Sequence, residues 1–94
     1  MIMPFEWDEE KAEDNLKKHG IGFDEAKTVF GDPFSITIDD PDHSDEEQRF
    51  IDIGYSKHGR ILVVVYTERG QNTRIISCRK ATLMERIKYE RQYI

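Results

Sequence analysis

An almost uninterrupted apolar run, Ile61 to Thr67, constrains the fold of this chain more than any other segment. The run is rich in β-branched residues and lacks the period-two alternation of a strand with one face in water. We therefore expect a central strand that is covered on both faces. Residues 49–55 before it alternate with period two, and residues 73–79 after it are again β-rich. The short turns at 57–59 and 69–72 predict that these strands form an antiparallel meander.

Helices are predicted before and after this meander. Asp8 is a suitable N-cap for a first helix that Gly20 ends, and its periodicity puts Ala12 and Leu16 on the buried side, with Asn15 beside them. The other segments are a short strand at 5–7, a short helix that begins at the N-cap Asp24, a strand at 34–38, an acidic loop at 39–47 and a final helix after the capping box of Thr82 and Glu85. This order predicts an α+β fold in which two N-terminal helices and a C-terminal helix pack on a small antiparallel sheet. We expect one domain, residues 1–94.

The charge is divided unevenly along the chain. The whole sequence has a formal net charge of -5, but residues 1–47 hold 4 Lys/Arg against 15 Asp/Glu, and residues 48–94 hold 10 against 4. A basic half of this kind is typical of proteins with a polyanion partner. The two halves could equally neutralise each other within the fold.

Cysteine and hydropathy patterns indicate a cytoplasmic protein. The single cysteine, Cys78, cannot form an internal disulfide, and its place in a strand favours a buried apolar role over a nucleophilic one. The longest apolar run is too short to span a bilayer, and the first residues do not form a secretory signal. Zinc-ligand spacing is absent, and the acidic loop lacks the spacing and glycine of an EF-hand. We therefore predict neither a metal site nor a cofactor.

Four segments of the chain, in order, resemble one protein family. They are FEWDEEKAEDNLKKHGIGFDEAKTVFGDP at 5–33, EEQRFIDIG at 46–54, LVVVYTERG at 62–70 and RIISCRKAT at 74–82. Together they are similar to the BrnT family of bacterial toxins. Cys78 departs from the family pattern, where a small residue such as alanine is expected.

The resemblance implies a fold similar to that of the RelE-type ribonucleases. It also implies a cytoplasmic endoribonuclease that stops translation by cleaving RNA. Its partner would be an antitoxin, BrnA, which neutralises the toxin and, as a complex with it, represses their shared promoter DNA. The alternatives are a non-catalytic module that docks the antitoxin and a plain RNA-binding domain.

RNA cleavage without a metal needs cations around the phosphate and groups that exchange protons with the ribose and the leaving oxygen. Arginine is the best phosphate clamp because its guanidinium matches phosphate geometry. Arg79 is therefore predicted as a catalytic clamp, although it could instead pair with the acidic half of the chain. The resemblance adds Arg49 as a second clamp, which could instead form a salt bridge with the glutamates before it.

The acid–base candidate is His19, which lies with Lys18 in the last turn of the first helix, where the dipole favours a charged imidazole. It could instead serve only to cap that helix.

The final helix is predicted to add RNA contacts. Its apolar stripe of Leu83, Ile87 and Ile94 would hold it on the sheet, which leaves Arg86 and Tyr89 beside the cations of the last strand. Tyr89 could stack on a base, or it could lie half-buried at the edge of the sheet. The predicted RNA-binding residues are Lys18, Arg74, Lys80, Arg86 and Tyr89.

Overall fold

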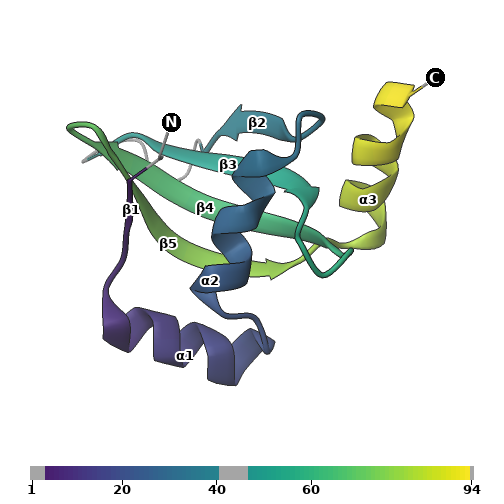
Figure 1. Ribbon diagram of the computed structural model, residues 1–94. Coiled ribbons are helices and arrows are strands. Elements are labelled where there is room, and N and C mark those ends of the chain that lie inside the picture. The colour runs from purple at the N-terminus through teal and green to yellow at the C-terminus, as the bar shows by residue number, and fades with distance from the viewer. Residues whose placement is uncertain (1–3, 41–46, 94) are drawn as a thin grey trace.

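The computed structural model describes residues 4–40 and 47–93, and five strands form one sheet in this part of the chain. The strands are β1 (Phe5–Glu6), β2 (Ile36–Asp39), β3 (Arg49–Tyr55), β4 (Ile61–Arg69) and β5 (Asn72–Lys80). They lie in the order β1-β5-β4-β3-β2, and every neighbouring pair is antiparallel except β1 and β5. The apolar run is the central strand β4, as predicted (Figure 1).

Helices lie on both faces of this sheet. They are α1 (Glu9–His19), α2 (Phe23–Ala26), α3 (Leu83–Glu90) and the 3-10 helices η1 (Lys27–Gly31) and η3 (Arg91–Tyr93). The α+β fold predicted from the sequence is confirmed. The second helix is shorter than expected and begins after Gly22, not Asp24, before it tightens into η1. Among the helices of the described residues, none is long and apolar enough to span a membrane.

Both faces of β4 are buried, which explains why its sequence does not alternate. Leu62 and Val64 pack with α2 and η1 on one face of the sheet. Ile61 and Val63 face the other way and pack with Tyr89 of α3. The prediction of a strand covered on both faces is therefore confirmed.

Local signals fix the ends of the two longer helices. The Asp8 carboxylate accepts hydrogen bonds from the amides of Glu10 and Lys11, and Gly20 ends α1 in the left-handed conformation with φ 70°. Both hydrogen bonds of the capping box between Thr82 and Glu85 are present at the start of α3. Such caps typically contribute about 0.5–2 kcal/mol each.

The buried side of α1 differs from the prediction. Leu16 is 53% exposed, whereas Asn15 is buried. The Asn15 amide nitrogen donates to the carbonyl oxygens of Cys78 (2.9 Å) and Ile21 (3.0 Å), and its oxygen accepts from the Cys78 amide (3.0 Å). Strand β1 pairs only with Thr73 and Arg74, so Asn15 takes the place of a neighbouring strand at Cys78.

The buried side of α3 also differs from the prediction. Ile87 of the predicted apolar stripe is partly buried and Ile94 lies outside the described residues, but Leu83 is 70% exposed and does not hold the helix on the sheet. Tyr89 does so instead, with a fully buried ring. Its hydroxyl donates to the Asp32 carboxylate at 2.5 Å, which satisfies the one polar atom that the burial would otherwise leave unpaired.

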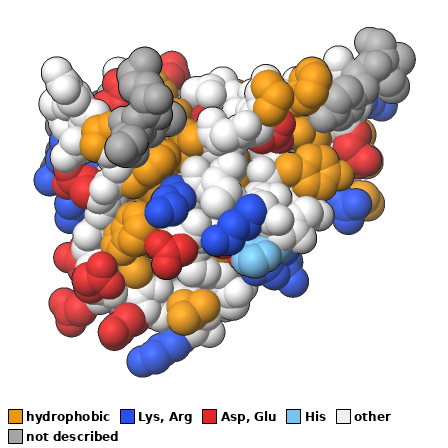
Figure 2. Space-filling view, in the orientation of Figure 1, with side chains coloured by type: hydrophobic (Ala, Val, Ile, Leu, Met, Phe, Trp, Pro, Cys, Tyr) orange, Lys and Arg blue, Asp and Glu red, His pale blue; other side chains and the backbone are white. Residues whose placement is uncertain are grey.

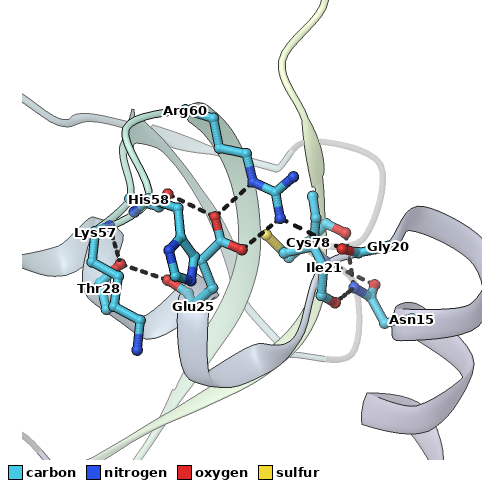
Figure 3. Close-up of polar contacts among 10 residues, drawn as sticks. Asn15, Gly20, Ile21, Glu25, Thr28, Lys57, His58, Arg60 and Cys78 are labelled. Atoms are coloured by element: carbon cyan, nitrogen blue, oxygen red, sulfur yellow. Dashed lines mark hydrogen bonds and ion pairs between the residues drawn. The ribbon is translucent and has the colours of Figure 1, made fainter.

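A buried carboxylate joins α2 to the hairpin between β3 and β4. Glu25 receives hydrogen bonds from Arg60 at 2.6 and 2.7 Å and from the Ser56 hydroxyl at 2.7 Å (Figure 3). The hydrogen bonds from Arg60 outweigh the effect of burial and lower the pKa of Glu25 to about 2. Glu25 and Arg60 are therefore both charged at neutral pH.

The first prediction concerns Asn15. We expect Asn15→Leu to lower the free energy of unfolding by roughly 2–4 kcal/mol, because it leaves buried backbone groups unpaired. Leu16→Ala is the matched control and should change the free energy by no more than about 0.5 kcal/mol, because the side chain is exposed. Urea unfolding measures both. A larger loss for Leu16→Ala would mean that α1 packs through its apolar stripe after all.

The second prediction concerns pH. Because the pKa of Glu25 falls from 4.5 to about 2 on folding, its contribution to stability is complete above pH 4.5 and is lost as the pH falls toward 2. We expect Glu25→Gln to cost at most about 3 kcal/mol at neutral pH and much less near pH 2. Glu13→Gln, at an exposed position of α1, is the control and should stay near the wild type at neutral pH. Unfolding curves of the wild type and of Glu25→Gln across this pH range test the prediction. A difference in the free energy of unfolding between the two proteins that stays constant with pH would contradict it.

Candidate functional site

The strand register divides the predicted cationic residues into two groups. Arg79 lies opposite Val63 on β4, whereas Arg49 and Arg74 both lie opposite Thr67. Four residues of β4 separate these positions, about 13 Å at roughly 3.3 Å per residue. Arg49 and Arg79 therefore lie at different ends of the sheet, and both could contact one extended strand of RNA.

Arg79 is held by a carboxylate of α3. Its two terminal nitrogens donate to Glu85 at 2.7 and 2.9 Å, a bidentate pair. Glu85 also accepts from the Thr82 amide at 2.8 Å as part of the capping box. Hydrogen bonds from Arg79 lower the pKa of Glu85 to about 2, so it stays ionised at neutral pH. Arg79 is thus in an ion pair, as the alternative expected, but its partner Glu85 belongs to the basic half of the chain and not to the acidic half.

A pocket lies next to Arg79, between the β3–β4 hairpin and the start of α3. Its volume is about 220 Å³, and its lining includes Tyr55, Arg60, Lys80 and Arg86. Lys80 and Arg86 are exposed, and neither forms an ion pair with any residue that the structure describes. The structure thus brings together two of the predicted RNA-binding residues and adds Tyr55 and Arg60, which the sequence did not reveal.

Arg60 could not be identified from the sequence because it follows a turn and has no pattern of its own. Its position depends on Glu25, which is far away in the sequence. Its Nη2 also lies 3.5 Å from the carbonyl oxygen of Gly20 (Figure 3). Arg60 therefore connects the pocket with the C-terminal end of α1.

Lys18 and His19 lie at that end of α1, on the face of the sheet that α1 and α2 cover. Neither lines the pocket, and His19 is partly buried while Lys18 is exposed. Because Gly20 is in contact with Arg60, His19 lies beside the pocket region but is not part of it. Figure 2 shows the acidic side chains gathered over the first half of α1 and cationic side chains nearer the middle of the molecule.

The prediction that Tyr89 stacks on an RNA base does not fit the burial of its side chain. Its ring is fully buried and its hydroxyl is bonded to Asp32. It packs edge-on against Tyr55, with ring centroids 5.5 Å apart and an interplanar angle of 79°. Tyr55 is the aromatic residue that is exposed at the pocket, and Tyr89 supports it from behind.

The cations at the other end of the sheet are paired with carboxylates. Arg74 donates to Glu6 at 2.7 Å, and hydrogen bonds from Asn72 and Arg74 lower the pKa of Glu6. Arg49 lies 3.9 Å from Glu47, and its Nε is buried without a hydrogen bond among the described residues. The salt-bridge alternative for Arg49 is therefore present, although in a weak geometry.

The remaining polar groups do not suggest other chemistry. Burial raises the pKa of the Cys78 thiol to about 12, which confirms the prediction that this cysteine is an apolar core residue and not a nucleophile. Within residues 4–40 and 47–93, no group of three His, Cys, Asp or Glu side chains is arranged to hold a metal ion.

Comparisons with known proteins agree with this description. A family model described as "Ribonuclease toxin, BrnT, of type II toxin-antitoxin system" matches residues 7–85. Among solved structures, the chain is similar to the crystal structure of the Brucella abortus ribonuclease toxin BrnT, with 26% sequence identity and a TM-score of 0.64. That similarity covers 86% of this chain and 99% of the other. A search of curated proteins finds no match. Because the family model spans most of the sequence and the fold agrees, the chain belongs to the BrnT family of ribonuclease toxins of type II toxin–antitoxin systems.

Proposed function

We propose that this ribonuclease toxin cleaves RNA without a metal ion at the end of the sheet where Arg79, Lys80 and Arg86 lie, and that it thereby inhibits translation in the cytoplasm. The observation that carries the proposal is the convergence of Lys80, Arg86 and Arg60 on one pocket beside Arg79. The whole chain, residues 1–94, acts as a single toxin domain.

In the proposed reaction the ribose 2′-oxygen attacks the adjacent phosphorus and the 5′-oxygen of the next nucleotide leaves. Arg79 stabilises the negative charge that develops on the phosphate oxygens, an effect that is strong where the donors are already in position. Glu85 holds the guanidinium through two hydrogen bonds, so Arg79 does not need to be ordered by the substrate. RNA that passes over this end of the sheet also comes near the last turn of α1.

Four more of the predicted residues have roles in this proposal. His19 is the candidate for proton transfer, since histidine is the side chain that most often acts in acid–base catalysis and the adjacent Gly20 contacts Arg60. Arg49 and Arg74 would bind phosphates farther along the RNA, and Lys18 would do so at the C-terminal end of α1. Their carboxylate partners Glu47 and Glu6 are partly exposed and could give way to a phosphate.

We further propose that the cognate antitoxin is similar to BrnA and covers β5 and α3. Leu83 and Met84 are 70% and 74% exposed on α3, beside the cations of the pocket. An apolar pair next to free positive charge suits a helix that carries apolar and acidic residues. The toxin–antitoxin complex would then bind its own promoter DNA, with the active surface of the toxin hidden.

The third prediction tests metal-free cleavage. In excess EDTA we expect the purified toxin to cut RNA, and Arg79→Ala to lower the cleavage rate by a factor of 100 or more, roughly the effect of removing one preorganised oxyanion donor. Arg91→Ala, which removes an exposed arginine of η3, is the charge-matched control and should cut normally. Circular dichroism checks the fold of each variant. An Arg79→Ala protein that unfolds would show that Arg79 is a structural ion-pair partner. A wild-type protein that binds RNA without cutting it would be a non-catalytic RNA-binding domain.

The fourth prediction tests occlusion by the antitoxin. We expect RNA and antitoxin to compete, because the proposed antitoxin contact covers Arg79, Lys80 and Arg86. A variant with Leu83→Ser and Met84→Ser should bind the antitoxin at least tenfold more weakly while cleavage stays near the wild-type rate. Fluorescence anisotropy of a labelled RNA follows the competition. A ternary complex in which RNA stays bound and uncut would point to inhibition at a distance.

A further inference from the structure

The pocket between the β3–β4 hairpin and α3 combines one aromatic ring with three cations. Tyr55, Arg60, Lys80 and Arg86 all contribute to its wall, and among the residues that the structure describes no carboxylate lines it. At about 220 Å³ it is smaller than the roughly 300–1,000 Å³ pockets that enclose whole small molecules. It therefore suits a part of a larger anionic ligand, such as one phosphate with its sugar.

Two of the four side chains are fixed before any ligand binds. Arg60 is fixed by the two hydrogen bonds to the buried Glu25. Tyr55 is fixed through its backbone, because its amide donates to Asp32 at 2.9 Å, and through its ring, which packs against Tyr89. Prior ordering of this kind lowers the entropy that binding must offset.

The other two side chains supply charge that the protein does not neutralise. Lys80 ends β5 and Arg86 lies on the first turns of α3, both exposed and without an ion-pair partner in the described part of the chain. Two acidic groups on the adjoining elements are already engaged, Glu25 with Arg60 and Glu85 with Arg79. The pocket thus keeps a net positive charge.

We propose that this pocket is a nucleotide subsite, in which Lys80, Arg86 and Arg60 bind one phosphate and Tyr55 stacks on the adjoining base. That the natural ligand is RNA rests on the proposed function. The subsite binds a nucleotide next to the bond that is cut, and it places the neighbouring phosphate at Arg79. Stacking on tyrosine does not discriminate strongly among bases, so the subsite contributes affinity and register more than sequence preference.

The test is an NMR titration of the ¹⁵N-labelled full chain at constant ionic strength with adenosine, inorganic phosphate and adenosine 5′-monophosphate. We expect the amides of Gly59, Ile61 and Ala81 to shift with the two phosphate-bearing probes. The nucleotide should bind on the order of tenfold more tightly than phosphate because it adds the stacking contact. Adenosine that binds as tightly as the nucleotide, or unshifted amides at the pocket, would overturn the proposal.

Matched variants separate the two contacts. Tyr55→Leu should reduce nucleotide affinity to that of phosphate, whereas Tyr55→Phe should retain it. Arg86→Gln should weaken phosphate binding severalfold, whereas Lys88→Gln, a neighbouring cation that does not line the pocket, should have no effect. Equal losses for Arg86→Gln and Lys88→Gln would mean that phosphate responds only to the overall charge of α3.

These probes have no internucleotide bond, so the result does not depend on cleavage. Phosphate binding at the pocket in a protein that does not cut RNA would support the subsite and overturn the proposed function. If the protein cuts RNA but its pocket amides do not shift with the probes, the proposed function would be supported and the subsite overturned.

Discussion

The carboxylate of Asp32 joins three parts of the molecule on which the pocket depends. It accepts hydrogen bonds from the amide of Phe34, the amide of Tyr55 and the hydroxyl of Tyr89. Burial raises the pKa of Asp32, but these hydrogen bonds outweigh it and leave a lowered pKa, so the group stays ionised at neutral pH. Glycine at position 54 allows this closeness to β3, since a Cβ there would lie 3.0 Å from the Ser35 Cβ and 3.1 Å from the Asp32 carboxylate. One side chain thus sets the position of η1, β3 and α3 together.

The features that were predictable from the sequence are those that local chemistry determines. Asp8, Gly20 and the Thr82–Glu85 capping box act within a few residues, and each forms the predicted contact. The burial of β4 on both faces could be predicted because such a strand lacks the period-two alternation of apolar and polar residues that a half-buried strand shows. By contrast, Asn15 and Tyr89 were misassigned because a polar atom in each found a distant partner, Cys78 and Asp32 respectively. Periodicity treats such residues as surface and cannot anticipate the partner.

The uneven charge of the chain is explained by both of the alternatives that the sequence left open. Arg60 and Arg74 from the basic half pair with Glu25 and Glu6 from the acidic half, so part of the asymmetry is neutralised within the fold. Lys80 and Arg86 have no such partner among the described residues, and both line the pocket. Part of the remaining positive charge therefore lies at the pocket, where a polyanion would bind, although the protein as a whole is acidic.

Different sides of helix α3 support the pocket and face solvent, where a partner could bind. At 100° per residue, Arg86 lies about 60° from Tyr89 on one side and about 60° from Leu83 on the other. Tyr89 is buried behind Tyr55, Leu83 faces solvent, and Arg86 lies at the boundary between them. An antitoxin helix on the exposed side of α3 would therefore reach Arg86 without displacing Tyr89. Such a contact would mask the pocket while the pocket itself stays assembled, so the toxin released from the complex would need no refolding of this region to bind RNA.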